Sequence, residues 1–321
     1  MGIIVHQMNS VITFNPLAME RVWGGRRFES LPGKKLPAGV PVGELWEVVD
    51  REDAQSVVDS GIFEGETLHG LWQKHRNEIF GEDYLASPAF RFPLLIKLLD
   101  AADKLSVQVH PPADKAVAMG GEPKTEVWYF LESLPEALVY AGLKKGVTQA
   151  EFEQRLATGG VEDTLHAIPV HTGESIFIPS GRLHAIGGGN LIVEIQQNSD
   201  TTYRVYDWGR LGLDGAPRTL HVRESMESID FNDFEPGVSG ADSLMVADCP
   251  LFRVQKCALS HSKDVRPKGR FALCVSTGGA VRCGGRVFQK GGFFLIPASG
   301  ERLEVAPVDE ESTILVCTLP A

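Results

Sequence analysis

The chain has 321 residues, of which 43% are hydrophobic and 23% are charged. This composition is typical of a folded globular protein with a buried core. Its 31 basic and 42 acidic residues give a formal net charge of −11, which argues against general binding of nucleic acid or of an anionic membrane. The N-terminus lacks the pattern of a signal peptide, and no apolar run is long enough to span a membrane. We therefore expect a cytoplasmic protein.

Short β-type runs separated by Gly and Pro dominate the sequence and predict a mainly β protein. Runs rich in β-branched and aromatic residues predict strands over 11–14, 44–49, 92–98, 105–109, 127–131, 175–178 and 191–195. Short strands at this spacing favour a sandwich or a barrel.

Two helical segments interrupt the strands. The first, near 64–80, has Leu68, Leu71 and Trp72 on one helical face. The second, near 148–160, begins with the capping box Thr148-Gln-Ala-Glu and ends at a Gly pair. We expect the second helix to be an insertion that covers one side of the barrel, and a weaker helix over 112–119.

An acidic, polar stretch near 223–248 looks like a linker between two domains. Strand-like runs resume at 251–258, 271–276, 292–296 and 312–318. We therefore predict two domains, 1–246 and 247–321. All five cysteines fall after residue 248 without a CxxC pair, a pattern that favours free thiols over disulfides or a zinc knuckle.

The most informative stretch is residues 173–184, whose spacing G-x5-P-x-G-x2-H ends at His184. A Pro-Gly turn there would deliver the histidine onto the next strand. This spacing resembles the second motif of the cupin superfamily, whose histidine binds metal. Earlier in the chain, Gln108 and His110 are two residues apart and therefore lie on one face of a strand. Lys124 and Glu126 repeat that arrangement.

Together these strands would offer two nitrogen and two oxygen ligands, from Gln108, His110, Glu126 and His184, a set that suits Zn²⁺. Taken singly, each of the four side chains would more often be structural. The polar run that follows Glu194, QQNSDTTYR, is costly to bury unless it lines a polar cavity. Alone it would be read as a surface turn, but its place ten residues after His184 favours a position beside the metal.

The combined motifs resemble type I mannose-6-phosphate isomerase in its short bacterial form. They are LSVQVHP (105–111), KTEVWYFL (124–131), IPSGRLHAI (178–186) and EIQQNSDTTYRVYDWGR (194–210), with NPLAMERVWGG (15–25), GELWEVVD (43–50) and FPLLIKLLDA (92–101) in support. The resemblance covers most of residues 11–222. It implies a mainly β fold of two cupin-type jelly-roll barrels with a small helical insertion.

The resemblance also implies one Zn²⁺ per chain, held by the four candidate ligands named above. It implies a functional arginine at Arg204, a lysine lining the site at Lys124 and a serine near the sugar phosphate at Ser106. Asp200 belongs to the retained Ser-Asp pair and is a further candidate for substrate contact. One departure from the family pattern is Gly187–Gly189, which predicts a slightly longer connection between His184 and Glu194 than in the eukaryotic members.

The implied reaction interconverts mannose 6-phosphate and fructose 6-phosphate through a cis-enediol. It needs a base at carbon and a stabilising charge on oxygen. Glu194, Lys124 and Asp200 are the candidates for the base, and Arg204 offers a permanent cation. As a base, Lys124 would need a lowered pKa; otherwise it would bind an anion. The expected partner is a small sugar phosphate, and the chain is expected to be a monomer or a homodimer.

The C-terminal segment repeats the glycine–strand–proline–glycine pattern from Gly291, with Leu303 near the position of the histidine. This predicts a second cupin-type barrel without a metal site, with a structural or interface role. Two other functions remain open on the sequence. One is an iron-dependent cupin oxygenase, for which Gln108 would be an unusual ligand. The other is a non-catalytic sugar-binding or regulatory cupin.

Overall fold

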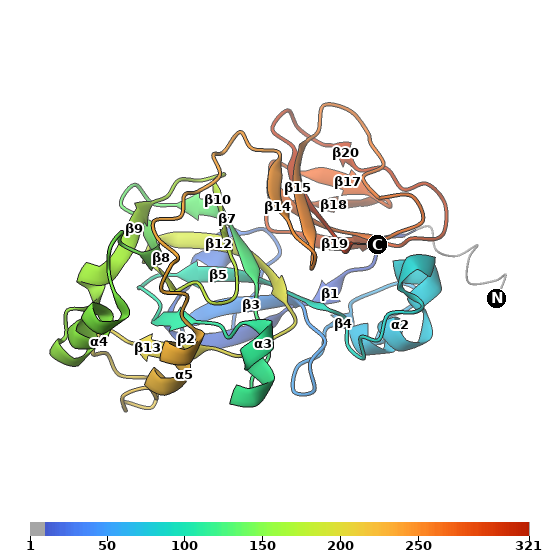
Figure 1. Cartoon of the computed structure of the whole chain (residues 1–321). Helices are drawn as coiled ribbons and strands as arrows, with labels where there is room; N and C mark the ends of the chain where they lie inside the picture. Colours follow the sequence, from blue (N-terminus) through green and yellow to red (C-terminus); the bar gives the residue numbers. More distant parts are fainter. Residues whose placement is uncertain (1–9, 321) are drawn as a thin grey trace.

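The computed structural model describes residues 10–320 and consists of two β-barrels that lie side by side (Figure 1). The N-terminal barrel contains the strands that carry the predicted ligands. Its first sheet consists of β2 (Leu17–Gly25), β3 (Val42–Val48), β5 (Leu94–Ala101), β7 (Glu126–Ser133), β10 (Ser175–Ile178) and β12 (Asn190–Gln197). Their spatial order is β10-β7-β12-β5-β2-β3, and β3 also pairs with β5. Every pair is antiparallel, as expected for a jelly roll.

The second sheet of this barrel closes the other side of its interior. It consists of β6 (Val107–Val109), β8 (Leu138–Leu143), β9 (Leu165–Pro169), β11 (His184–Ile186) and β13 (Tyr203–Tyr206). Their order is β13-β6-β11-β8-β9. A small separate sheet pairs β1 (Phe14–Asn15) with β4 (Val57–Val58).

The C-terminal barrel is built from residues 245–318 and is also antiparallel. Its larger sheet consists of β14 (Met245–Asp248), β15 (Arg253–Ala258), β16 (Ala272–Gly278), β19 (Phe293–Ile296) and β21 (Thr313–Thr318). Its smaller sheet consists of β17 (Val281–Cys283), β18 (Arg286–Phe288) and β20 (Ala306–Pro307). Strand β14 begins at Met245, close to the predicted boundary at 246/247. The division into two separate domains stays a prediction.

The three predicted helices are present as α2 (Leu68–Lys74), α3 (Ala113–Ala116) and α4 (Gln149–Thr158). Helix α5 (Val222–Ser228) was not predicted. Shorter helical turns are η1 (Arg27–Ser30), η2 (Arg76–Phe80), η3 (Glu82–Tyr84), η4 (Val117–Met119) and η5 (Val161–Thr164). The capping box of α4 forms as expected, because the Thr148 hydroxyl accepts a bond from Glu151 N–H at 3.2 Å. Within residues 10–320, no helix is long and apolar enough to cross a membrane.

Helix α4 covers the outer face of the second sheet of the N-terminal barrel. Its Phe152 is fully buried in a cluster with Val109 and Val205, which come from β6 and β13. The sequence therefore placed this insertion correctly on one side of the barrel. Figure 1 shows α4 on the side of the molecule away from the C-terminal barrel.

The stretch 223–248 is more ordered than the linker that its composition predicts. Its first residues belong to helix α5, which ends at Ser228. The chain then runs along the N-terminal barrel, where Phe234 forms a β-bridge with Leu143 and Ser239 forms one with Ser175. Its backbone hydrogen bonds are therefore made with the barrel instead of with water. Acidic composition alone did not reveal these contacts, because they are made mainly by the main chain.

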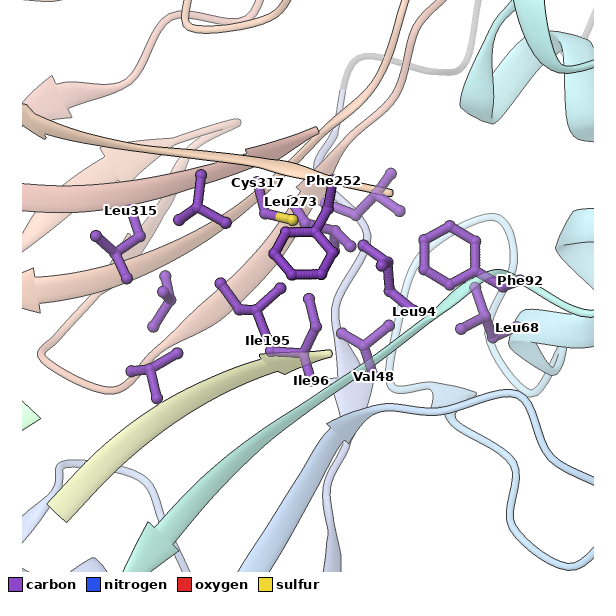
Figure 2. Packing of buried hydrophobic residues seen from close by; sticks show 14 of the residues in the cluster. Val48, Leu68, Phe92, Leu94, Ile96, Ile195, Phe252, Leu273, Leu315 and Cys317 are labelled. Carbon is purple, nitrogen blue, oxygen red and sulfur yellow. The ribbon is translucent and has the colours of Figure 1, made fainter. Parts of the chain in front are cut away.

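Strand β5 separates the two interiors of the molecule through the alternation of its side chains. Leu94 and Ile96 join a core that includes Phe252, Leu273 and Leu315 of the C-terminal barrel (Figure 2). The alternate residues Leu95 and Lys97 point to the opposite face, into the N-terminal barrel. One sheet therefore faces the interior of the N-terminal barrel on one side and packs against the second barrel on the other.

Candidate metal centre and active cavity

Two histidines and a glutamate from different strands meet inside the N-terminal barrel. The ligand atoms of His110, Glu126 and His184 all lie within 4.8 Å of one another. Each of the three side chains is buried, with 1% or less of its surface exposed. Glu126 opens β7 in the first sheet and His184 opens β11 in the second, so the site lies between the two sheets.

The chain turns sharply before His184, as the motif predicts. Gly173 and Gly181 have φ values of 90° and 91°, a left-handed conformation that glycine adopts at little cost. The Gly181 N–H then donates to the carbonyl of His110 at 2.9 Å. This bond ties the turn that delivers one histidine to the backbone of the other.

Both imidazoles are oriented by main-chain carbonyls. Nδ1 of His110 lies 2.8 Å from Thr201 O, and Nδ1 of His184 lies 2.9 Å from Arg182 O. A carbonyl only accepts, so these contacts place the ring proton on Nδ1 and leave the lone pair of Nε2 free to bind a metal. Burial lowers the pKa of His110 and, with the charge of His110, lowers the pKa of His184 to about 3. Both rings are therefore neutral at neutral pH.

Glu126 completes a donor set that fits a divalent cation. Both its carboxylate oxygens are buried and lack a well-aligned hydrogen bond among the described residues, although Lys124 Nζ lies 2.7 Å from Oε2. His110 Nε2 and His184 Nε2 each lie 3.7 Å from one of these oxygens. Burial opposes the charge of Glu126, but Lys124 outweighs it and holds its pKa well below the ordinary value. Two neutral imidazoles and a carboxylate are ligands that Zn²⁺ accepts.

Gln108 lies beside this group in β6. It pairs with His184 in one neighbouring strand and with Arg204 in the other, so the three side chains share a face. Gln108 Nε2 is 3.3 Å from His184 Nε2, and Ser106 Oγ donates to Gln108 Oε1 at 3.3 Å. A metal would need Oε1 on the histidine side. Rotation of the amide by half a turn provides it, because the two ends differ little in shape.

A cavity of about 570 Å³ opens next to the donor set. Its wall includes the predicted residues Ser106, Gln108, Lys124, Glu194, Asp200 and Arg204. The three buried ligands lie behind Gln108 and Lys124. The structure therefore brings every predicted substrate-contacting side chain to one cavity beside the predicted metal ligands.

Glu194 is held in this cavity by three groups that its motif did not reveal. Its Oε2 accepts from Trp128 Nε1 at 3.1 Å, while Oε1 lies 3.2 Å from Lys97 Nζ and 3.8 Å from Lys124 Nζ. Burial raises the pKa of Glu194, and the two lysines counter this effect. Lys97 is the only cation in the mainly apolar run FPLLIKLLDA, a signal that could have marked it as a cavity residue.

Without a bound ion, the neighbours of Lys124 favour its charged form; its role as a base, which would need a pKa lowered by Zn²⁺ and Arg204, stays a prediction. Burial favours the neutral amine, but the charges of Glu126 and Glu194 dominate and raise the pKa of Lys124 above its ordinary value. Its Nζ also lies 3.3 Å from His110 Nε2. Lys124 is thus an ammonium placed between the donor set and Glu194.

The Gly187–Gly189 segment forms a tight connection between β11 and β12. A Cβ on Gly187 would lie 2.5 Å from Leu138 O, so a side chain does not fit there. Gly189 has a φ of 90°. These glycines therefore allow a tight turn between β11 and β12. Glu194, in β12, still lines the cavity.

Comparison with known proteins identifies the family. Residues 12–131 match the family model described as phosphomannose isomerase type I, catalytic domain. The chain is 35% identical over 297 residues to mannose-6-phosphate isomerase ManA of Bacillus subtilis, covering 88% of this chain and 92% of the relative. It is also 35% identical over 270 residues to mannose-6-phosphate isomerase of Streptococcus mutans, covering 82% and 83% of the two chains.

Solved structures agree over nearly the whole chain. The crystal structure of mannose 6-phosphate isomerase from B. subtilis superposes with a TM-score of 0.81 at 29% identity, covering 97% of this chain and all of that one. A mannose 6-phosphate isomerase bound with zinc and yttrium has the same fold, with a TM-score of 0.72 at 16% identity over 97% and 100% of the two chains. Relatedness across both barrels, together with the motifs, shows that this chain belongs to the type I mannose-6-phosphate isomerases.

Proposed function

We propose that the chain interconverts mannose 6-phosphate and fructose 6-phosphate with one Zn²⁺ per chain. The observation that carries the proposal is the convergence of His110, Glu126 and His184 beside a cavity that contains Gln108, Lys124 and Glu194. Gln108, His110, Glu126 and His184 would hold the ion. When bound, Zn²⁺ would supply a Lewis acid that stabilises negative charge on the sugar oxygens.

Glu194 is the base that the geometry favours. In the forward direction its carboxylate removes the proton from C2 of the open-chain aldose, which gives a cis-enediolate. The hydroxyl proton of O2 then moves to O1 while the carboxylic acid returns its proton to C1, and the product is the ketose. No co-reactant is consumed. The bond from Trp128 and the ion pair with Lys97 fix both carboxylate oxygens of Glu194, as a proton transfer in a defined geometry requires.

The other predicted residues contact the substrate in this proposal. Lys124 Nζ lies next to Glu194 and can donate a hydrogen bond to the oxygen on which charge develops. Arg204 and Ser106 line the same cavity, on the strands that flank or carry Gln108. Asp200 is exposed at the cavity wall, so we assign it substrate contact and not proton transfer.

A coupled assay that detects fructose 6-phosphate formed from mannose 6-phosphate tests the activity directly. Protein purified without added metal is analysed for bound metal in the same experiment. Turnover with one zinc per chain is the expected result. Folded, zinc-loaded protein without turnover would refute the isomerase, whereas iron together with oxygen uptake would favour the oxygenase. Sugar phosphate binding without turnover would favour a non-catalytic cupin. The cytoplasmic location and the monomeric or dimeric state stay predictions.

A further inference from the structure

The ring of His184 is oriented by the main chain of Arg182, whose carbonyl oxygen lies 2.9 Å from His184 Nδ1. This carbonyl can hold the imidazole in place only if Arg182 is itself fixed. The side chain of Arg182 provides the fixation. Its Nη1 donates to Phe177 O at 2.7 Å, and its Nε and Nη2 donate to the two carboxylate oxygens of Asp233 at 2.7 and 2.8 Å. One residue therefore holds the metal ligand with its carbonyl and binds a distant carboxylate with its guanidinium group.

The contact between Arg182 and Asp233, which we call the clasp, is well formed. Two parallel N–H···O bonds fix the plane of a guanidinium group as well as the position of its charge. The two side chains are only 15% and 16% exposed, so water and salt screen the contact less than they screen an ion pair on the open surface. The clasp is therefore able to hold the main chain of Arg182 in one position.

Asp233 comes from a segment outside the barrel. We call this segment, residues 229–244 between α5 and β14, the strap, and Figure 1 shows it running along the N-terminal barrel. The Asp230 N–H donates to Gly181 O at 2.8 Å, and the Leu143 N–H donates to Asp233 O at 2.9 Å. The strap is thus bonded through its main chain to the same turn that contains Arg182 and to strand β8 beside it.

The strap approaches strand β8 most closely at Gly142. A Cβ at this position would lie 2.9 Å from Asp233 O and 3.2 Å from Asp233 Oδ2. Gly142 also has a φ of 68°, a conformation that favours glycine. Its N–H donates to the carbonyl of Leu183 at 2.8 Å, the residue between Arg182 and His184. Glycine at this position therefore lets the Asp233 carboxylate come close enough to reach Arg182.

Resting on the proposed function and its zinc site, we propose that Asp233 is a positioning residue of the metal centre, which fixes Arg182 and, through the Arg182 carbonyl, the ring of His184. Without the carboxylate, Phe177 O would be the remaining partner of the Arg182 guanidinium group among the described residues. The Arg182 carbonyl would then be held less firmly, and Nε2 of His184 would point to the ion in a smaller fraction of molecules. The expected consequence is a lower affinity for zinc with all proposed ligands still present.

The C-terminal barrel contains a matched clasp that holds no proposed metal ligand. Arg266 Nε and Nη2 donate to the two carboxylate oxygens of Asp264 at 3.1 and 3.0 Å, and Arg266 Nη1 donates to Pro297 O at 2.8 Å. These two side chains are 9% and 21% exposed. Asp264→Asn therefore removes the same kind of contact, and its effect shows what the loss of such a clasp does to stability alone.

The zinc affinity of the full chain tests the proposal, measured by competition with a chromophoric chelator after bound metal has been removed. Contacts that orient a metal-bound imidazole are worth about 10- to 100-fold in metal affinity. We expect Asp233→Asn to raise the Kd of zinc by about tenfold, the low end of this range, because the carbonyl that contacts His184 remains. Saturating zinc should bring kcat back to within about threefold of wild type by mass action.

Two control variants should keep the zinc Kd within about twofold of wild type, because they do not touch the clasp. Asp230→Asn removes the same charge from the strap, and its amide oxygen can still accept the bond from Asn232 N–H. Asp264→Asn should lower the urea midpoint about as much as Asp233→Asn does, without weakening zinc binding. A purely structural role of Asp233 would give the same loss of stability and no selective change in the zinc Kd.

Equal zinc Kd values in the Asp233→Asn and Asp230→Asn proteins would overturn the proposal, as would equal weakening in Asp233→Asn and Asp264→Asn. If Asp233→Asn does not fold, Arg182→Lys takes its place, because lysine keeps the charge and the carbonyl but lacks the planar fork. Wild-type zinc affinity in the Arg182→Lys protein would then refute the positioning role.

Chelator competition does not depend on turnover, so the two proposals can fail separately. If zinc binding weakens in Asp233→Asn but the wild type does not isomerise mannose 6-phosphate, the proposed function is refuted and the positioning role stands. If the wild type isomerises the sugar phosphate and Asp233→Asn keeps its zinc affinity, only the positioning role is refuted.

Discussion

The two barrels share a pattern and differ in what fills them. Each has a glycine, a short strand, a proline and a glycine before the last position of the motif, which is His184 in the N-terminal barrel and Leu303 in the C-terminal one. His184 points to Glu126, whereas Leu303 packs against an apolar cluster. The C-terminal interior is lined by Val, Ile, Phe, Ala and Cys side chains, with Phe288 and Phe294 stacked at 4.2 Å.

The N-terminal interior instead buries ionic groups, and these come in pairs. Lys97 lies 3.2 Å from Glu194, and Lys124 lies 2.7 Å from Glu126. A buried charge is costly unless it is paired. The N-terminal barrel therefore has less apolar burial in its interior than the C-terminal barrel, and its paired charges line a polar cavity. The same fold can therefore serve either stability or chemistry, depending on the side chains directed inward. That the C-terminal barrel binds no metal stays a prediction.

Substitutions at the matching motif positions of the two barrels should differ most in their effect on activity and zinc content. His184→Ala deletes one imidazole of the donor set, and we expect kcat/KM to fall by at least about 10⁴-fold because the Lewis acid is lost. Bound zinc, measured by mass spectrometry, should fall with it. The matched variant Leu303→Ala should keep both zinc and kcat/KM close to wild type. If Leu303→Ala lost the metal, or His184→Ala kept it, the metal would not be where we place it.

Glu194→Gln should give the second largest effect. The amide keeps the size of the side chain but cannot accept a proton, so kcat should fall by about 10³-fold. Bound zinc should remain, because Glu194 is not among the proposed ligands. Steady-state kinetics with metal analysis checks this result. A variant that keeps wild-type kcat would exclude Glu194 as the base and return Asp200 and Lys124 to consideration.

The joint between the barrels can be tested through Phe252. This side chain is fully buried in the core shared by Leu94, Ile96 and Leu315, so Phe252→Ala should lower the free energy of unfolding by about 3–5 kcal/mol. The zinc content should not change, since the cavity lies on the other face of β5. Urea unfolding followed by fluorescence should show one transition for both barrels. Two separate transitions in the wild type would mean that the barrels are stable independently.

The sequence was most informative where a pattern is local. The capping box predicted α4, and the turn before His184 was expected from glycine and proline alone. The alternation in β5 could have been read further, because its apolar positions Leu94, Ile96 and Leu98 face the C-terminal barrel while Lys97 faces the cavity. This run predicted a strand, but its two faces were not assigned.

Long-range contacts explain most of what the sequence did not show. Trp128 and Lys97 hold Glu194 from neighbouring strands, and such partners are set by strand register, which a single sequence does not reveal. The same applies to Arg218, whose Nε donates to Asp207, eleven positions earlier in the chain. The convergence of His110, Glu126 and His184 was predictable because their motifs resemble those of a known family. The supporting residues depend on how the strands pair.

The smallest predicted effect is a loss of unfolding free energy at low pH, and its source should lie in the N-terminal barrel. Glu44 is 8% exposed. Burial alone would raise the pKa of Glu44, but Lys97 and Arg21 outweigh burial and lower it to about 2. Because the folded pKa lies below the unfolded one, this carboxylate stabilises the protein fully above about pH 4.5. That stabilisation is lost as the pH falls toward 2.

Between pH 6 and pH 3 this single group should account for about 2 kcal/mol of the loss in unfolding free energy. Urea titrations at both pH values should show a smaller loss for Glu44→Gln than for wild type, because glutamine does not titrate. The matched variant Glu304→Gln changes a half-exposed carboxylate of the C-terminal barrel, 3.4 Å from Arg302, and should keep the wild-type loss. An equal loss in all three proteins would mean that the charged interior of the N-terminal barrel is not the source of its acid sensitivity.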